Sequence, residues 1–417
     1  MHWPVEAIRT QFQGLQRQAG GGTAAFFDGP AGSQVPECVI DAVSNYLRHT
    51  NCNRDAVFPS GVESDAVLDA AWQTVAEFLG TADPDCVVFG ANMTTLTFQV
   101  SRALSRQWKP GDEIIVSRLD HDANVTPWVL AAEEAGVTVH RIELDRDEWK
   151  LNLNDFREKL SPRTRLVAVG YASNATGTIN PVKEMIDEAH RVGALVYIDA
   201  VHFAPHGRLQ ADQLNCDFLV CSAYKFFGPH VGILYGRRKL LTEIRPYKLR
   251  PSSERLPGRW MTGTQNHEGI AGAAAAVRYL AELVHLPDSQ SSAGLSARLD
   301  ETFRQIQTYE LRLAERLIQG LLRIRQLRLY GIQRFSDFHL RVPTFSFTWS
   351  GKAPAEIARY LSQRGLFVWH GNHYALPFTQ TAGLEPDGTV RVGLMHYNTV
   401  EEVDRLLEAL NDLSAKS

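Results

Sequence analysis

The stretch Ser222-Ala223-Tyr224-Lys225-Phe226-Phe227-Gly228-Pro229-His230 places one lysine among aromatic and small residues. It follows directly on Phe218-Leu219-Val220-Cys221, a short apolar run that predicts a buried strand. A lysine beyond such a strand is expected to be desolvated, which lowers the pKa of its amine and makes it a Schiff-base former. A surface lysine with only its stem buried fits poorly, because Phe226 and Phe227 leave little exposed surface around Lys225.

Apolar runs of the same kind recur between residue 65 and about residue 240. Amphipathic segments such as 126–136 and 182–192 separate several of them and predict helices. Strands without polar alternation, spaced by helices, indicate a largely parallel sheet covered on both faces, with ligands beyond the carboxyl ends of its strands. The six runs are Cys86–Phe89, Glu113–Val116, Leu166–Val169, Leu195–Ile198, Phe218–Cys221 and Gly232–Tyr235.

The remaining segments predict the domain organisation. With 417 residues the chain exceeds what one hydrophobic core usually supports. We expect an N-terminal helix over 5–18 that ends in a glycine hinge, within an arm (1–35) that joins the small domain. A phosphate-loop interpretation of Gly20-Gly21-Gly22 is disfavoured because no Lys-Ser/Thr pair follows. The large domain is predicted at 36–290. A small α+β domain is predicted at 291–417, after helices within 270–325, with strands at 344–349 and 389–394 and helices at 354–364 and 400–413.

Composition excludes several classes of protein. Apolar residues make up 44% and charged residues 22%, as in soluble globular proteins, and no apolar stretch approaches a spanning helix. The formal net charge is −4 with both signs interspersed, which argues against nucleic-acid binding. The N-terminus lacks the pattern of a secretory signal. The five cysteines include no CxxC, so we expect reduced, mostly buried thiols, no metal site and a cytoplasmic location.

Polar residues follow the predicted strands. Gly90-Ala91-Asn92-Met93-Thr94-Thr95 enters a helix and is a possible phosphate cradle, although a threonine there is usually only a cap. Asp199 directly follows four apolar residues, where a carboxylate costs several kcal/mol unless it is paired. From position alone, a capping or salt-bridged role for Asp199 remains equally open. The other polar groups are Asp120-His121-Asp122-Ala123-Asn124, Ser173-Asn174-Ala175-Thr176-Gly177-Thr178, Asp199-Ala200-Val201-His202 and Ser222-Ala223-Tyr224-Lys225.

This ordered series, from Thr94-Thr95 to Ser222-x-x-Lys225, resembles the class V aminotransferases and most closely their cysteine desulfurase branch, over residues 20–412. The resemblance implies the α/β fold of pyridoxal-phosphate (PLP) fold type I, the aspartate aminotransferase-like fold. That fold has a mostly parallel seven-stranded sheet sandwiched by helices and a smaller α+β C-terminal domain. It also implies pyridoxal 5′-phosphate as cofactor, a small amino acid as substrate and a homodimer.

The resemblance assigns roles residue by residue. Lys225 would carry the cofactor as a Schiff base and later move the Cα proton of the substrate. Asp199 would pair with the pyridinium nitrogen, His121 would stack on the ring, and Asn174 and His202 would lie near its O3′. Arg391, which as an isolated residue could be a surface arginine, matches the arginine that binds the α-carboxylate. The phosphate contacts would come from Met93, Thr94, Ser222 and Tyr224, and from Thr264 of the neighbouring subunit.

One segment departs from the desulfurases. Asp28-Gly29-Pro30-Ala31-Gly32 and Gly371-Asn372-His373-Tyr374-Ala375 resemble a cysteine desulfurase-like subfamily, in which true desulfurases carry the attacking cysteine in the second segment. Here Tyr374 takes that place, every cysteine lies at or before Cys221, and Cys221 itself is expected in the core.

We therefore expect external aldimine and quinonoid chemistry that ends in β-elimination or C–S lysis without a persulfide. The alternatives are transamination, then kynureninase-type or decarboxylative C–C chemistry, and a non-enzymatic role. The sequence does not identify the amino acid.

Overall fold

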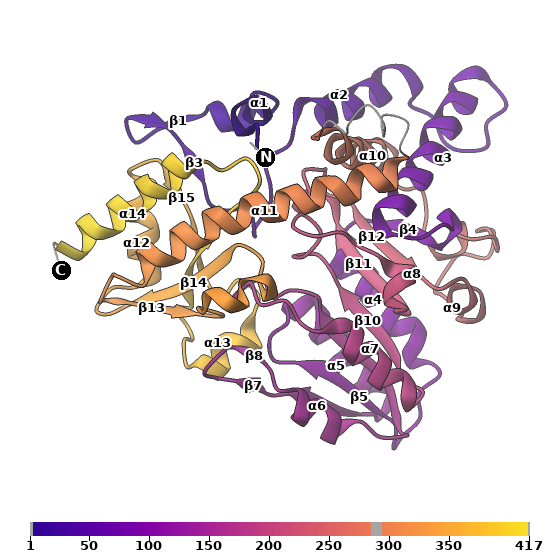
Figure 1. Ribbon diagram of the computed structural model, residues 1–417. Helices are drawn as coiled ribbons and strands as arrows, with labels where there is room; N and C mark the ends of the chain where they lie inside the picture. Colours follow the sequence, from indigo (N-terminus) through magenta and orange to yellow (C-terminus); the bar gives the residue numbers. More distant parts are fainter. Residues whose placement is uncertain (1–2, 285–293, 416–417) are drawn as a thin grey trace.

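A twisted seven-stranded sheet forms the centre of the computed structural model, which describes residues 3–284 and 294–415 (Figure 1). The strand order of this central sheet is β4-β12-β11-β10-β9-β5-β6. Strand β12 is antiparallel to both of its neighbours, and the other pairings are parallel. The predicted largely parallel sheet is thus confirmed. Its strands are β4 (Val87–Gly90), β5 (Glu113–Ser117), β6 (Thr138–Ile142), β9 (Thr164–Gly170), β10 (Leu195–Asp199), β11 (Phe218–Ser222) and β12 (Gly232–Gly236).

Successive side chains of these strands enter two different cores, because side chains alternate between the faces of a sheet. On β10, Val196 and Ile198 pack against α3, α7 and α10, whereas Tyr197 between them packs against α4, α5 and α9. Both faces are therefore dry, which explains why the strands lack polar alternation. The covering helices include α2 (Glu37–Asn45), α3 (Pro59–Leu79), α4 (Met93–Ser105), α5 (Thr126–Ala135), α6 (Leu153–Lys159), α7 (Val182–Arg191), α8 (Ala211–Leu214), α9 (Arg238–Glu243) and α10 (His267–Glu282).

A second, four-stranded antiparallel sheet organises the C-terminal part of the chain, with the order β13-β14-β17-β16. Phe345, Phe347 and Val392 on its strands pack against helices of the same region in a separate core. The expected strands at 344–349 and 389–394 and the expected helices at 354–364 and 400–413 are all present. The elements are β13 (Leu327–Tyr330), β14 (Thr344–Trp349), α12 (Pro354–Ser362), β15 (Leu366–Phe367), β16 (Trp369–Gly371), α13 (Leu376–Ala382), β17 (Thr389–Gly393) and α14 (Val400–Ala415).

Helix α11 (Leu295–Leu321) connects the two cores (Figure 1). Leu299, Phe303 and Ile306 in its first half pack into the core beside the central sheet, whereas Leu317 and Leu321 pack into the core of the four-stranded sheet. Helices α10 and α11 confirm the helical prediction for 270–325, whose masked part, 285–293, lies outside the described residues. The exact domain boundaries stay a prediction.

The N-terminal segment differs from the single helix expected over 5–18. The chain forms α1 (Val5–Arg9), a 3-10 turn (Gln13–Gln16) and then the short hairpin β1 (Gln18–Ala19) and β2 (Gly22–Thr23). Gly20 and Gly21 have φ values of 62° and 87°, so this glycine run is a hairpin turn and not a helix-ending hinge. Strand β3 (Ala25–Phe26) then pairs with β15, which places the N-terminal arm against the C-terminal region.

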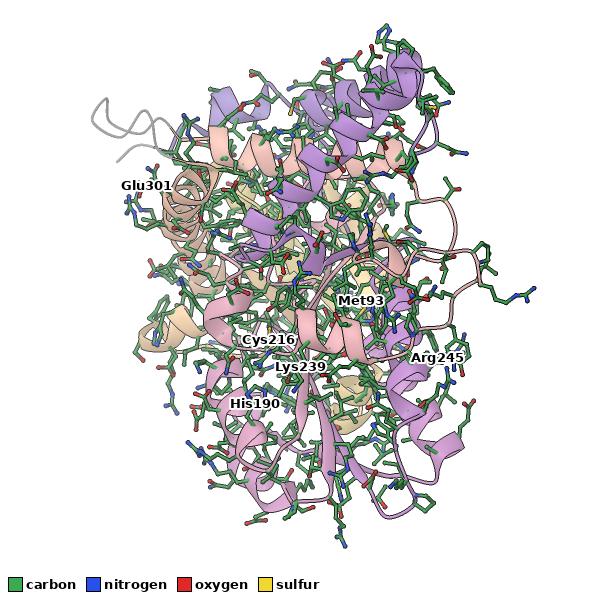
Figure 2. The ribbon with its side chains drawn as sticks, turned by 90° about the vertical axis from the view of Figure 1, so that its right-hand side faces the viewer. Met93, His190, Cys216, Lys239, Arg245 and Glu301 are labelled. Atoms are coloured by element: carbon green, nitrogen blue, oxygen red, sulfur yellow. The ribbon has the colours of Figure 1, made fainter. Side chains whose placement is uncertain are left out.

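The five cysteines are all free, and Cys86, Cys216 and Cys221 are buried, as expected for reduced core thiols; Cys216 is labelled in Figure 2. Within 3–284 and 294–415, no helix is long and apolar enough to cross a membrane. The same residues contain no cluster of side chains that could hold a metal ion.

Candidate active site

Lys225 lies in a single 3-10 turn (Ala223–Lys225) that follows β11 and is 8% exposed. Its Nζ donates a hydrogen bond to the carbonyl of Pro30 and lies 4.9 Å from the centre of the Tyr224 ring. Burial lowers the pKa of the Lys225 amine to about 7, with a further contribution from the charge of Arg391, and the carboxylates of Asp199 and Asp28 oppose this shift. A neutral, nucleophilic amine is therefore accessible near neutral pH.

An inner cavity lies beyond the carboxyl ends of the strands. It is bordered by Lys225 and, among others, by Thr94, His121, Asn174, Asp199 and Ser222. These residues lie at or beyond the carboxyl ends of β4, β5, β9, β10 and β11, so strands far apart in the sequence contribute to one cavity. The convergence expected from the strand ends is present in the structure.

Asp199 is the last residue of β10 and is buried at the floor of the inner cavity. Its Oδ1 accepts a hydrogen bond of 2.9 Å from the backbone N–H of Val201, a local cap at the strand end. Burial raises the pKa of the Asp199 carboxyl to about 7, and the nearby carboxylate of Asp120 adds to this effect. Among the described residues no salt bridge to Asp199 forms, so the salt-bridged alternative is not supported, whereas the capping alternative describes one of its oxygens.

The start of α4 borders the same cavity. Asn92 caps the helix by accepting a 2.9 Å hydrogen bond from the N–H of Thr95, and the N–H of Met93 donates to Ser222 Oγ at 3.0 Å. A side chain at Gly232 would collide with the backbone of Asn92, so glycine lets β12 approach the helix start closely. The positive end of a 13-residue helix, with hydroxyls beside it, suits a phosphate group.

His121 and Asn174 also line the inner cavity. The Nδ1 of His121 accepts a 3.1 Å hydrogen bond from the N–H of Ala123. Burial, together with the charges of Lys225 and Arg391, lowers the pKa of His121 to about 4, so its ring is a neutral imidazole suited to stacking. Asn174 Nδ2 donates to the carbonyl of His373 at 2.8 Å, while its buried Oδ1 has no hydrogen-bond partner among the described residues.

His202 also borders this cavity, but its Nε2 is paired with Thr344 Oγ1 at 2.9 Å. Burial and the neighbouring His206 hold the pKa of His202 well below its usual range, so the ring is neutral. A neutral imidazole keeps one donor and one acceptor, and Thr344 engages only one of them. His202 can therefore still contact a group in the inner cavity.

Arg391 lies on β17 and is 5% exposed, which rules out the alternative of a surface arginine. One guanidinium nitrogen donates to the carbonyl of Asn174 at 3.0 Å. Burial lowers the pKa of Arg391 to about 9, and the carboxylate of Asp28 opposes this shift. Asp28 has a buried Oδ1 without a hydrogen-bond partner in the described part of the chain, and its pKa is raised to about 6 by burial. The sequence shows Asp28 only as part of a subfamily motif and carries no local signal of its position beside Lys225 and Arg391.

An outer cavity of about 680 Å³ adjoins the inner one and shares Thr94, His121, Asn174 and Lys225 with it. Arg391 and Tyr374 border the outer cavity, and Tyr374 is 72% exposed. Tyr224 borders both cavities, as expected for a residue next to Lys225. Thr264 lies on the surface in the segment before α10 and borders neither cavity of its own chain.

Comparison with known proteins identifies this arrangement. The sequence profile "Aminotransferase class-V" matches residues 25–406. The chain belongs to the class V aminotransferase family. The family expected from the sequence is thereby confirmed, and with it pyridoxal 5′-phosphate, the cofactor of this family.

Among its relatives, the class V chain is 32% identical over 98% of its length to a probable cysteine desulfurase of Mycolicibacterium paratuberculosis, of which it spans 58%. It is also 32% identical over 97% of its length to the aminotransferase-like protein FGM3 of Gibberella zeae, of which it spans 97%. The apo structure of a cysteine desulfurase from Thermococcus onnurineus superposes with a TM-score of 0.88 at 27% identity, covering 100% of this chain and 99% of the other. This likeness confirms the predicted fold.

The residues of the class V site fit this cofactor. Lys225 has an amine that can react with the aldehyde of pyridoxal phosphate. Burial raises the pKa of the Asp199 carboxyl, and the protonated ring nitrogen of the cofactor would supply a positive charge that neutralises it. The unpartnered Asn174 Oδ1 leaves a buried polar atom to be satisfied from within the cavity. The individual roles of these residues stay predictions.

Proposed function

We propose that this protein is a PLP-dependent lyase that removes the Cβ substituent of a small α-amino acid, as in C–S cleavage, without passing sulfur to a thiol of its own. The observation that carries the proposal is Tyr374, which stands at the opening of the outer cavity where desulfurases of this branch are expected to carry cysteine.

The cysteines of the chain are poorly suited to replace that thiol. In the described residues no cysteine borders either cavity. Burial raises the pKa of Cys86 and of Cys216 to about 12 and raises that of Cys221 as well. Persulfide formation needs an accessible thiolate, which these environments disfavour.

Arg391, Lys225 and Asp199 are each suited to a different step of this reaction. Arg391 is suited to bind the substrate carboxylate through two parallel hydrogen bonds, which orients Cα toward Lys225. Lys225 Nζ, neutral near pH 7, is suited to take the Cα proton. Pyridoxal phosphate, when bound, supplies a sink for the electron pair that this proton leaves behind. Asp199 is suited to stabilise the protonated form of the cofactor nitrogen.

Elimination then balances without an external oxidant or reductant. The Cα–H electron pair becomes part of a Cα–Cβ double bond, and the Cβ–S bond breaks with both electrons on sulfur. The thiolate takes up a proton and leaves as a thiol. The released enamine is hydrolysed by one water to pyruvate and ammonium.

Transamination is the second candidate, supported by the likeness to the aminotransferase-like protein FGM3. It uses the same Lys225 and Arg391 but returns the proton to the cofactor and leaves the Cβ substituent in place. A reaction of this kind needs an acceptor oxo acid to continue beyond one turnover.

Product analysis separates these reactions. The purified protein, loaded with pyridoxal phosphate, is incubated with cysteine and with β-chloroalanine. Elimination yields pyruvate and ammonium over many turnovers, whereas desulfuration yields alanine and a persulfide on the protein. Transamination yields the intact β-substituted oxo acid in a single turnover that an added oxo acid sustains. Alanine with a protein persulfide would overturn the proposal.

We also propose that the protein acts as a homodimer in which Thr264 completes the neighbouring site. Its exposed position, outside both cavities of its own chain, leaves it available to a second subunit. Thr264→Val should weaken cofactor binding without changing the oligomeric state in sedimentation. A monomeric protein that binds the cofactor fully would contradict the assignment.

A further inference from the structure

Two large aromatic side chains are exposed at the opening of the outer cavity. Trp369 is 52% exposed and Tyr374 is 72% exposed, and both border this cavity together with the half-buried Phe98. We call Phe98, Trp369 and Tyr374 the aromatic rim. Exposed aromatic rings gathered around a cavity are typical of a binding surface, because they offer large apolar area at little cost in conformational entropy.

Trp369 is fixed next to the predicted carboxylate-binding residue. Strands β16 and β17 are antiparallel, and Trp369 lies directly opposite Arg391 in their register. Side chains of directly opposed residues point to the same face of a sheet, with Cβ atoms about 4.5–5.5 Å apart. The side chains of Trp369 and Arg391 therefore leave the sheet on the same face, and both border the outer cavity.

Tyr374 is held in place by backbone hydrogen bonds and by His121, which borders both cavities. His373 and Tyr374 both have left-handed backbones, with φ values of 56° and 55°. The carbonyl of Tyr374 accepts a 2.7 Å hydrogen bond from the N–H of Asp122, and its N–H donates to Asn372 Oδ1 at 3.1 Å. The phenol ring stacks on His121 with centres 5.4 Å apart and planes 19° apart. This part of the rim is thus preorganised.

The position of the substrate follows from these fixed points. With the carboxylate on Arg391 and Cα at Lys225, the Cβ substituent has the outer cavity as its remaining space, since the inner cavity holds the cofactor. The three rim side chains carry no charge. They therefore favour an apolar group over the small thiol of free cysteine.

We propose that the substrate is a cysteine S-conjugate, an α-amino acid whose sulfur carries an aryl or alkyl group, and that Trp369 and Tyr374 determine this specificity. The inference rests on the proposed elimination. The Cβ–S bond breaks as described above, and the sulfur leaves as an apolar thiol that needs no acceptor on the protein.

The first experiment compares two substrates of the holoenzyme. S-Benzylcysteine carries the apolar group and β-chloroalanine lacks it. The ratio of their kcat/KM values is expected to fall about tenfold in Trp369→Ala, because the benzyl group loses the apolar area that the indole covers. Tyr374→Phe should keep the ratio. Phe335→Ala removes an exposed aromatic ring that does not border either cavity and serves as the matched control.

The second experiment needs no turnover. Calorimetry measures the Kd of 4-phenylbutyrate and of butyrate, both of which carry the carboxylate but no amine. 4-Phenylbutyrate should bind about tenfold more tightly than butyrate, and Trp369→Ala should remove the difference.

The outcomes separate the two proposals. No pyruvate from β-chloroalanine would overturn the elimination, whereas the binding difference could still be observed. Pyruvate from β-chloroalanine with no preference for S-benzylcysteine, and no difference between the two carboxylates, would overturn the specificity alone.

Discussion

The inner and outer cavities adjoin, yet they are built from different parts of the chain. The inner cavity is formed by residues at or beyond the carboxyl ends of the central strands, among them Lys225, Asp199 and His121, for which the sequence resemblance predicts cofactor roles. Another wall of the outer cavity comes from β16 and the segment after it, which carries Tyr374, the residue predicted to replace a desulfurase cysteine.

This difference indicates which residues of the site can change without disturbing the fold. Residues at the ends of buried strands are fixed by the packing of two cores, so their chemistry is tied to the fold. The wall on β16 belongs to an exposed edge strand of the small sheet, where a side chain can change without disturbing a core. We therefore expect the inner cavity to determine the cofactor, and the outer cavity to determine which substrate is bound and which of its bonds is cleaved.

The strongest test of the comparison replaces the centre of the inner cavity. Lys225→Ala should abolish covalent cofactor attachment and reduce turnover by on the order of 10³-fold, because the proton-transferring amine is lost. Absorption spectra before and after borohydride treatment measure the attachment. A borohydride-sensitive band in the variant would place the attachment on another lysine.

A smaller effect is expected where the two cavities meet. Arg391→Ala should raise the KM for α-amino acids by about 10- to 100-fold, because charge-assisted hydrogen bonds contribute about 1.5–3 kcal/mol each. Steady-state kinetics measure this change, with Arg328→Ala on the exposed side of the same sheet as control. An unchanged KM would remove Arg391 from the carboxylate site.

The smallest expected effect concerns the stability of the cofactor-free protein. The pKa of Lys225 is about 7 in the folded protein and 10.5 in its usual range, so the unfolded state binds more protons between these values. The free energy of unfolding therefore increases as pH rises from 7 toward 10.5, and it decreases as pH falls through the same range.

Lys225→Met removes this titration. Its Tm should exceed that of the wild-type apo-protein by a few degrees at pH 7, and the difference should shrink at pH 9.5. Asp199 titrates mainly at lower pH. Its pKa is raised from 3.8 to about 7, so its contribution to the free energy of unfolding is lost as pH rises between these two values, below the range in which Lys225 titrates. Equal differences at both pH values, measured by calorimetry, would show that the Lys225 amine is not desolvated.

Much of the inner cavity could be predicted from the sequence because each strand leaves a polar residue at its carboxyl end. The rule locates Asp199 and Lys225 without knowledge of long-range contacts. It does not locate Asp28, which reaches the site from the N-terminal arm through tertiary packing that no local pattern signals. Trp369 was missed for the same reason, since only the pairing of β16 with β17 brings it beside Arg391.

Local patterns also failed where strands or helices are short. Strand β6 was not among the runs identified because its residues are mostly half-exposed at the edge of the sheet, which gives no continuous apolar run. The apolar spacing over 5–18 indicated one helix, but Ile8 and Leu15 are buried from two separate turns. Burial of both residues satisfies the helical spacing without a continuous helix.

Helix α11 has a mechanical consequence. It is a single rod of 27 residues, and its two halves are embedded in different cores. A swing of the C-terminal region about a loose joint would have to bend this rod or pull one half from its packing. We therefore expect the distance between Lys225 and Arg391 to be fixed by the fold before a substrate binds, so that a substrate has to fit a cavity of preset width.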